Sequence, residues 1–207
     1  MSHVQSVRPR MVGIRISART FGEILIPVVA VAVLAGCASD PARRARVATE
    51  ESSHLAAPTT PLSSYGKFEL KPMEMSPAIA DDAAKVAAAK HLEGLVQARV
   101  QPLLAQWNAQ GANSTAANRT LIVQPRVVSL RIVSGGARFF TGALAGESSV
   151  GMVLELKDAA TGAVIAKPRI ERTASAMAGG WSVGATDRNL MDYVADIAGQ
   201  YLQDHRK

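Results

Sequence analysis

The sequence predicts an α+β fold, in which a small antiparallel or mixed sheet carries two helices on one face. Three observations support this class. A strand pattern is followed by a long alanine-rich helical pattern, then by two or three further strand patterns and a final helical pattern. The length of 207 residues fits one domain with appendages. Aromatic residues make up only 4% of the chain, so the core must consist mainly of aliphatic side chains.

The first 36 residues are typical of a secretory signal peptide. Four arginines stand in the first 20 residues, and residues 24–36 then form a run of thirteen without a charge. This run is shorter than the roughly 20 apolar residues that a membrane-spanning helix needs. It leads into Cys37, which is the only cysteine of the chain, so no disulfide can form within the chain.

The stretch Leu34-Ala35-Gly36-Cys37 resembles the lipobox of bacterial lipoproteins. In that family the cysteine thiol is joined to diacylglycerol, the leader is cut off before it, and the new amine is acylated. The resemblance implies lipidation at Cys37 and membrane lipid as a partner. Ala38 follows in place of an aspartate. By resemblance to sorting in enteric bacteria, this implies the outer membrane with the body facing the periplasm, and the inner membrane and cell surface are the weaker alternatives.

We divide the chain into a signal peptide at 1–36, a lipid-anchored flexible tether at 37–64 and a periplasmic α+β domain at 65–207. Three prolines, many small polar residues and the absence of apolar periodicity predict the tether. Its basic residues could contact anionic lipid headgroups, although a solvated basic run is the commoner explanation. These residues are Arg43, Arg44 and Arg46.

The body begins with a strand and a helix. Phe68 and Leu70 alternate with charged residues, which predicts the strand. Asp81 and Asp82 then open a helix that runs to about Trp107, because acidic residues in the first turn favour the helix dipole. Pro102 either kinks this helix or begins a second one.

Two strand patterns and a hairpin follow. Residues 121–133 predict a strand with Val128, Leu130 and Ile132 on one side, and Pro125 suggests an edge or a bulge. Residues 150–158 alternate cleanly, and the turn that ends in Gly162 leads to a partner strand.

The last helix is predicted to start near Thr186 or Asp187. Its apolar stripe consists of Leu190, Val194, Ile197 and Tyr201, reinforced by Met191, Ala198 and Leu202. Its acids, Asp187, Asp192, Asp196 and Asp204, are predicted to lie mostly on the solvent face.

Candidate binding residues lie in the glycine-rich stretch 134–151 and around the second tryptophan. The stretch lacks the ending of a phosphate loop, so we favour a long hairpin connection, with an exposed apolar tip as an alternative. The possible partner-binding residues are Arg138, Phe139, Phe140, Gly142, Gly146 and Trp181. For Trp181 we favour a place in the core over a role in binding.

The sequence predicts no catalytic residue, no metal site and no cofactor. The four histidines lack ligand spacing, and neither HExxH, CxxC nor a serine-hydrolase elbow occurs. After the leader, 19 basic residues face 16 acidic ones. This mild excess argues against nucleic acid as a partner.

The run at 135–166 resembles a domain-of-unknown-function family of small bacterial envelope lipoproteins. The matching residues are Arg138, Gly142, Gly146, Asp158, Thr161 and Gly162. The resemblance implies no catalytic residues.

The expected function is a non-enzymatic, lipid-anchored binding or assembly module in the periplasm at the outer membrane, with an envelope protein as its possible partner. A subunit of an outer-membrane export or pore-forming assembly is one alternative, and an envelope enzyme with an unrecognised site is the other. The sequence leaves the oligomeric state open.

Overall fold

The computed structural model describes residues 41–111, 116–131, 147–174 and 185–206. The chain divides into two units, Met1–Asp40 and Pro41–Lys207, and the described residues all belong to the second. The helices are α2 (Pro41–Ser53), α3 (Pro77–Ala80), α4 (Ala83–Gly111) and α7 (Ala185–Asp204), with a 3-10 turn η2 at Leu62–Ser64. The strands are β1 (Lys67–Leu70), β2 (Glu74–Met75), β3 (Thr120–Arg131), β4 (Ser148–Asp158), β5 (Val164–Ala166) and β6 (Arg169–Ala174).

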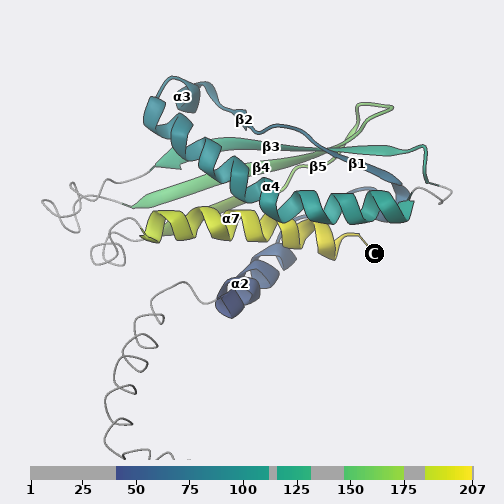
Figure 1. The fold of residues 1–207 in the computed structure, drawn as a ribbon, viewed down its shortest axis with the longest axis horizontal. Helices are drawn as coiled ribbons and strands as arrows, with labels where there is room; N and C mark the ends of the chain where they lie inside the picture. Colours follow the sequence, from purple (N-terminus) through teal and green to yellow (C-terminus); the bar gives the residue numbers. More distant parts are fainter. Residues whose placement is uncertain (1–40, 112–115, 132–146, 175–184, 207) are drawn as a thin grey trace, which may run out of the picture. The chain divides into compact units, whose positions relative to one another are not determined.

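The six strands among the described residues form one mixed sheet, which confirms the predicted fold class. β3 and β4 are the long central pair and run antiparallel. β1 and β2 pair with β3 in parallel, and β5 and β6 pair with β4 in antiparallel orientation. α4 and α7 lie side by side on one face of this sheet, as predicted (Figure 1).

The helix-covered face of the sheet is apolar because the central strands alternate as the sequence predicts. On β4, Val150, Met152, Leu154 and Leu156 are all buried. On α7 the predicted stripe from Leu190 to Tyr201 is buried as well. α4 adds its own stripe of Leu92, Val96, Val100, Leu104 and Trp107. These side chains form one continuous core between the sheet and the two helices.

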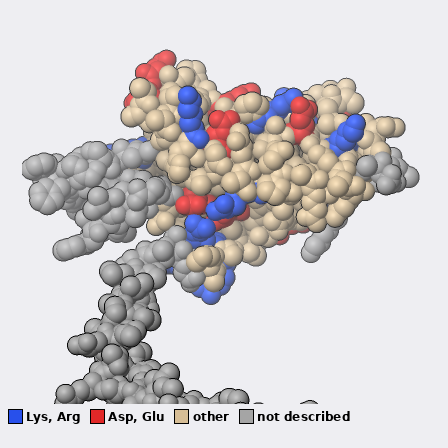
Figure 2. Space-filling model, viewed as in Figure 1, with Lys and Arg blue, Asp and Glu red and all other residues tan. Residues whose placement is uncertain are grey.

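Pro102 lies inside α4, so the two halves of the predicted segment form one helix. No helix among the described residues is both long enough and apolar enough to span a bilayer. The helix-covered side shown in Figure 2 is mostly neutral, with basic and acidic side chains scattered over it.

The prediction for β3 was wrong at Val128. Val127 is buried and Val128 is only partly buried, because the pairing with β4 shifts between Val127 and Ser129. This bulge reverses which residues face the helices. Leu130 is buried as predicted, and residue 132 lies outside the described residues.

Pro125 sits opposite the break between β1 and β2. The carbonyls of Val123 and Val127 accept hydrogen bonds from the N–H groups of Lys71 and Ser76, respectively. The backbone groups of odd-numbered residues in β3, including Pro125, therefore point toward β1 and β2. At Pro125 the neighbouring strand is interrupted. The missing N–H of proline therefore leaves no ladder partner unpaired.

The predicted hairpin turn is confirmed. The N–H of Gly162 donates to the carbonyl of Asp158 at 2.8 Å, and Gly162 has φ +73°, a conformation that glycine adopts without strain. The partner strand is split into β5 and β6 around Pro168.

The structure corrects the predicted tether over residues 41–64. Residues Pro41–Ser53 form α2, which packs against α7, and Leu62 is fully buried. The folded body therefore begins at Pro41 and not at Tyr65. The sequence pattern gave no sign of this helix because its inward residues are Arg44, Ala48 and Ser52, which have no apolar periodicity. The leader, Cys37 and the rest of residues 1–40 lie outside the described residues.

Candidate functional site: the junction of α2, α4 and α7

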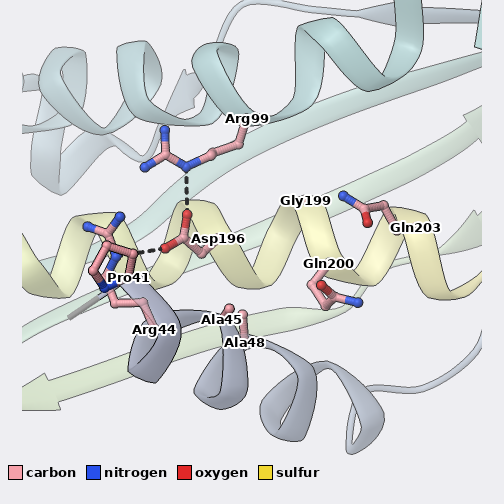
Figure 3. Close-up of a pocket in the computed structure, with 9 residues that line it drawn as sticks. All are labelled: Pro41, Arg44, Ala45, Ala48, Arg99, Asp196, Gly199, Gln200 and Gln203. Atoms are coloured by element: carbon pink, nitrogen blue, oxygen red, sulfur yellow. Dashed lines mark hydrogen bonds and ion pairs between the residues drawn. The ribbon is translucent and has the colours of Figure 1, made fainter. Parts of the chain in front are cut away.

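Two aspartates on α7 organise the place where three helices meet. Asp192 and Asp196 are four residues apart and lie on the same side of the helix. Arg44 reaches both from α2, and Arg99 reaches both from α4. Figure 3 shows the two arginines at Asp196. The prediction that these aspartates lie on the solvent face was wrong, because their side chains are only 20% and 15% exposed.

Each arginine bridges both carboxylates. Arg99 Nε donates to Asp196 Oδ1 at 2.6 Å, and Arg99 Nη2 donates to Asp192 Oδ1 at 3.3 Å. Arg44 lies with Nη1 3.2 Å from Asp192 Oδ1 and Nε 3.2 Å from Asp196 Oδ2. Two positive and two negative charges thus form a neutral cluster.

The two arginines are not equivalent. The contact of Arg99 Nε with Asp196 is short and aligned as a charge-assisted hydrogen bond, which is the stronger type of polar contact. Arg44 Nε is buried and close to Asp196, but it lacks the alignment of a hydrogen bond. Arg99 therefore holds Asp196 in place, and Arg44 attaches α2 to a carboxylate that is already oriented.

A cavity of about 220 Å³ adjoins the ion cluster. Its lining comes from all three helices and includes Pro41, Arg44, Ala45, Ala48, Arg99, Asp196, Gly199, Gln200 and Gln203. The small side chains Ala45, Ala48 and Gly199 leave the space, and Figure 3 shows the glutamines at the end of the cavity away from the ion pairs.

The charged side chains at this junction are suited to holding helices together and to orienting one another. The cavity lining contains neither a thiol nor an imidazole, and its one carboxylate, Asp196, is bound to two guanidinium groups. A carboxylate held in this way is a poor general base, because protonating it would break both ion pairs. Within the described part of the chain, no three His, Cys, Asp or Glu side chains are grouped so that they could hold a metal ion.

Further polar contacts fasten the other end of α2. Ser52 Oγ donates to Asp204 Oδ2 at 2.7 Å, and Arg172 of β6 pairs with Glu51. Arg172 also lies over the ring of Tyr193, 5.4 Å from its centroid.

Tyr201 secures the segment that follows α2. Its hydroxyl donates to the carbonyl of Ala56 at 2.9 Å, and burial raises the pKa of Tyr201 to about 12. α2 and the chain after it are therefore held to the body by these polar contacts together with the burial of Ala48 and Leu62 in the core.

A second charged cluster lies at the hairpin turn. Asp158 Oδ1 accepts the N–H groups of Ala160 and Thr161, and Oδ2 accepts Arg119 Nη2 at 3.0 Å and the Tyr65 hydroxyl at 3.2 Å. The Arg119 hydrogen bond, followed by the N–H of Thr161, lowers the pKa of Asp158 to about 2. Burial, followed by the hydrogen bond to Asp158, raises the pKa of Tyr65. This cluster joins the turn to the start of β1 and has a structural role.

Most of the residues predicted for function lie outside the described residues. They are Cys37, Arg138, Phe139, Phe140, Gly142, Gly146 and Trp181. The structure therefore does not bring them together or separate them. Of the residues that carried the family resemblance, Asp158, Thr161 and Gly162 form the confirmed hairpin turn.

Sequence reasoning missed the junction because its members are far apart in the chain. Arg44 was assigned to a tether and the aspartates to solvent, and Arg99 was not singled out. The available signal was the spacing of Asp192 and Asp196, since two like charges one turn apart repel each other unless cations lie beside them.

Comparison with known proteins found no protein-family model and no curated protein that matches. Among solved structures, PelC from Paraburkholderia phytofirmans, a dodecamer, is 17% identical with a TM-score of 0.38, covering 71% of this chain and 94% of PelC. A variant of PelC has 17% identity and a TM-score of 0.42, with 72% and 96% covered. A predicted lipoprotein from Caulobacter crescentus CB15 has 17% identity and a TM-score of 0.32, with 77% and 95% covered. At these values the similarity carries no argument about function.

Proposed function

We propose that this chain is a lipid-anchored envelope protein and that its folded body is a non-enzymatic binding or assembly module in the periplasm at the outer membrane. The observation that carries the proposal is the position of Cys37, the single cysteine, at the end of an uncharged run and directly after Leu34-Ala35-Gly36. A thiolate is the best nucleophile in the chain for accepting a lipid. Several acyl chains give firm anchoring, whereas one chain binds marginally.

The junction supports the non-enzymatic part of the proposal. Its charges neutralise each other, and its four ionised side chains hold helices together. A site for acid–base chemistry would instead need a carboxylate or imidazole that is free to exchange a proton at the reacting atom. The organisation fits a domain that presents a surface.

The anchor is tested by replacing the cysteine. Cys37→Ser should abolish incorporation of labelled palmitate and release the protein from the membrane fraction. Ala35→Ser is the matched control, because it changes the same motif, keeps a small residue and retains the thiol, so labelling should persist. Normal palmitate labelling and membrane association of Cys37→Ser would refute the proposal.

The membrane to which the protein is sorted needs its own test. Ala38→Asp should move the acylated protein from the outer to the inner membrane fraction in enteric cells. Equal distribution of the native protein and this variant would refute the outer-membrane assignment while leaving the anchor intact.

The partner is tested by crosslinking in intact cells with a photoreactive residue, followed by mass spectrometry. A specific envelope protein captured by the native chain and lost with Cys37→Ser supports the binding module. Capture of further copies of this chain in a defined ring would favour the alternative of an export or pore-forming assembly.

A further inference from the structure

We propose that the N-terminal end of α2 docks on the anionic surface of the membrane that holds the anchor, so that the body lies against the lipid headgroups. This inference rests on the proposed lipidation of Cys37. It goes beyond an anchor alone, because it names the surface of the body that meets the membrane.

The first argument is the length of chain between the anchor and the fold. Pro41, the first residue of α2, stands four residues after Cys37. Four residues span at most about 14 Å. A tether that reached residue 64 would span up to roughly 95 Å when extended. Since α2 is part of the folded unit, the body has only the shorter connection to the lipid.

The second argument is the way in which α2 divides its arginines. Arg44 faces inward and is bound by Asp192 and Asp196. Arg43 and Arg46 lie on the exposed side of the helix. These two side chains stand in the first two turns, next to the chain that leads to the anchor.

The third argument is the sign of the charge along the helix. The first six residues of α2 contain three arginines and no acid, and the two acids, Glu50 and Glu51, come in the second half. Glu51 is paired with Arg172 of β6. In Figure 2, basic side chains gather over α2 at the lower margin of the described surface. The end of α2 nearest to the anchor therefore complements an anionic surface.

The expected size of the effect follows from membrane electrostatics. A basic side chain near an anionic leaflet contributes about 1 kcal/mol, which corresponds to about a fivefold change in the docking equilibrium. Two arginines together should change that equilibrium by about 30-fold. Because the attraction acts over about 8 Å at physiological salt, it should weaken as the salt concentration rises.

The test uses the acylated protein, purified from membranes and reconstituted into vesicles. With Cys37 blocked by lipid, a cysteine introduced by Thr49→Cys on the exposed side of α2 is the only free thiol, and it receives a fluorescent donor. The acceptor is attached to lipid headgroups. A second label site, Ala78→Cys in the exposed part of α3, reports the part of the body away from α2.

In vesicles of phosphatidylcholine with phosphatidylglycerol, energy transfer should be high from Thr49→Cys and low from Ala78→Cys. Arg43→Gln with Arg46→Gln should lower the docking equilibrium constant about 30-fold and reduce the difference in energy transfer between the two label sites. High salt or pure phosphatidylcholine should have the same effect. Lys67→Gln with Lys90→Gln is the matched control, since it removes the same charge from exposed positions on β1 and α4 and should change nothing.

Each contrary outcome has a distinct meaning. Acylated protein whose α2 signal is the same in neutral and anionic vesicles, or is unchanged by the double arginine variant, overturns the docking proposal alone. A bare Cys37 sulfur in the mass spectrum overturns the proposed function and the docking proposal with it. Circular dichroism of both double variants should match the native protein, because the replaced side chains are exposed.

Discussion

Replacing Asp196 with asparagine should destabilise the fold more than the same change at Asp192. Asp196 accepts the short hydrogen bond from Arg99 at 2.6 Å and lies 3.2 Å from Arg44 Nε. Asp192 has only the longer contacts of 3.2 and 3.3 Å. Asparagine keeps the size of the side chain and removes its charge, so the comparison isolates the ion pairs.

The magnitude follows from the geometry. A hydrogen bond to a charged group contributes about 1.5–3 kcal/mol, and an exposed ion pair contributes about 0–1 kcal/mol. Arg99 is 34% exposed and Arg44 18% exposed, so solvent screens part of the interaction. We expect Asp196→Asn to lower the free energy of unfolding by about 2 kcal/mol and Asp192→Asn by about 1 kcal/mol.

The assay is urea unfolding of the purified protein, followed by circular dichroism and repeated at low and high salt. If the same proteins are unfolded by heat, a loss of about 2 kcal/mol corresponds, for a unit of this size, to a fall in Tm of about 4–8 °C. Glu69→Gln on the exposed face of β1 is the control for loss of one acidic charge. A double-mutant cycle with Arg99→Gln should give a coupling of about 1–2 kcal/mol. Equal stability of Asp196→Asn and the control would refute the view that this cluster holds the helices together.

Three further predictions concern the rest of the fold. Gly111→Ala should be strongly destabilising, because its Cβ would lie 2.2 Å from a backbone oxygen, whereas Gly94→Ala, with nothing within 4 Å, should stabilise α4 by up to about 1 kcal/mol in the same unfolding assay. Since the pKa of Asp158 is lowered to about 2, its contribution to stability should be complete above pH 4 and should disappear as the pH falls toward 2. Over that pH range Asp158→Asn should therefore lose less stability than the native chain. Burial raises the pKa of Tyr201 to about 12, so the stability of the native chain should fall between about pH 10 and 12. Tyr201→Phe should reduce that fall. At neutral pH the same variant should lose about 1 kcal/mol of unfolding free energy, because the hydrogen bond to Ala56 is lost.

The parts of the fold that the sequence predicted are those where side-chain periodicity and local turn chemistry act together. The β4 alternation and the α7 stripe each place apolar residues on one side at the spacing of their element. The hairpin turn needs only Asp158 to accept nearby N–H groups and Gly162 to adopt a positive φ. All of these signals lie within a few neighbouring residues.

The parts that the sequence did not predict depend on contacts between distant residues. α2 carries an arginine, an alanine and a serine on its buried side, and these residues form a helix here because Asp192, Asp196 and Asp204 lie across from them. The bulge after Val127 depends on pairing with β4, and no residue in β3 marks it. The candidate site is built from the same long-range contacts, so it was missed together with α2.

The arginines of α2 lie on two sides of the helix. The stability of the fold and the contact with an anionic membrane can therefore be tested by different substitutions. Arg44 is tied to the body, so Arg44→Gln should loosen the N-terminal end of α2 and lower the stability of the fold in solution, with no membrane present. Arg43 and Arg46 are exposed, so their loss should leave the stability in solution unchanged and alter only the contact with an anionic surface. If Arg44→Gln left the stability intact, the ion pairs of Arg44 would not hold the N-terminal end of α2 to the body. If the exposed pair affected the stability as much as Arg44 does, Arg43 and Arg46 would not be available to the membrane alone, and the docking proposal would lose its second observation.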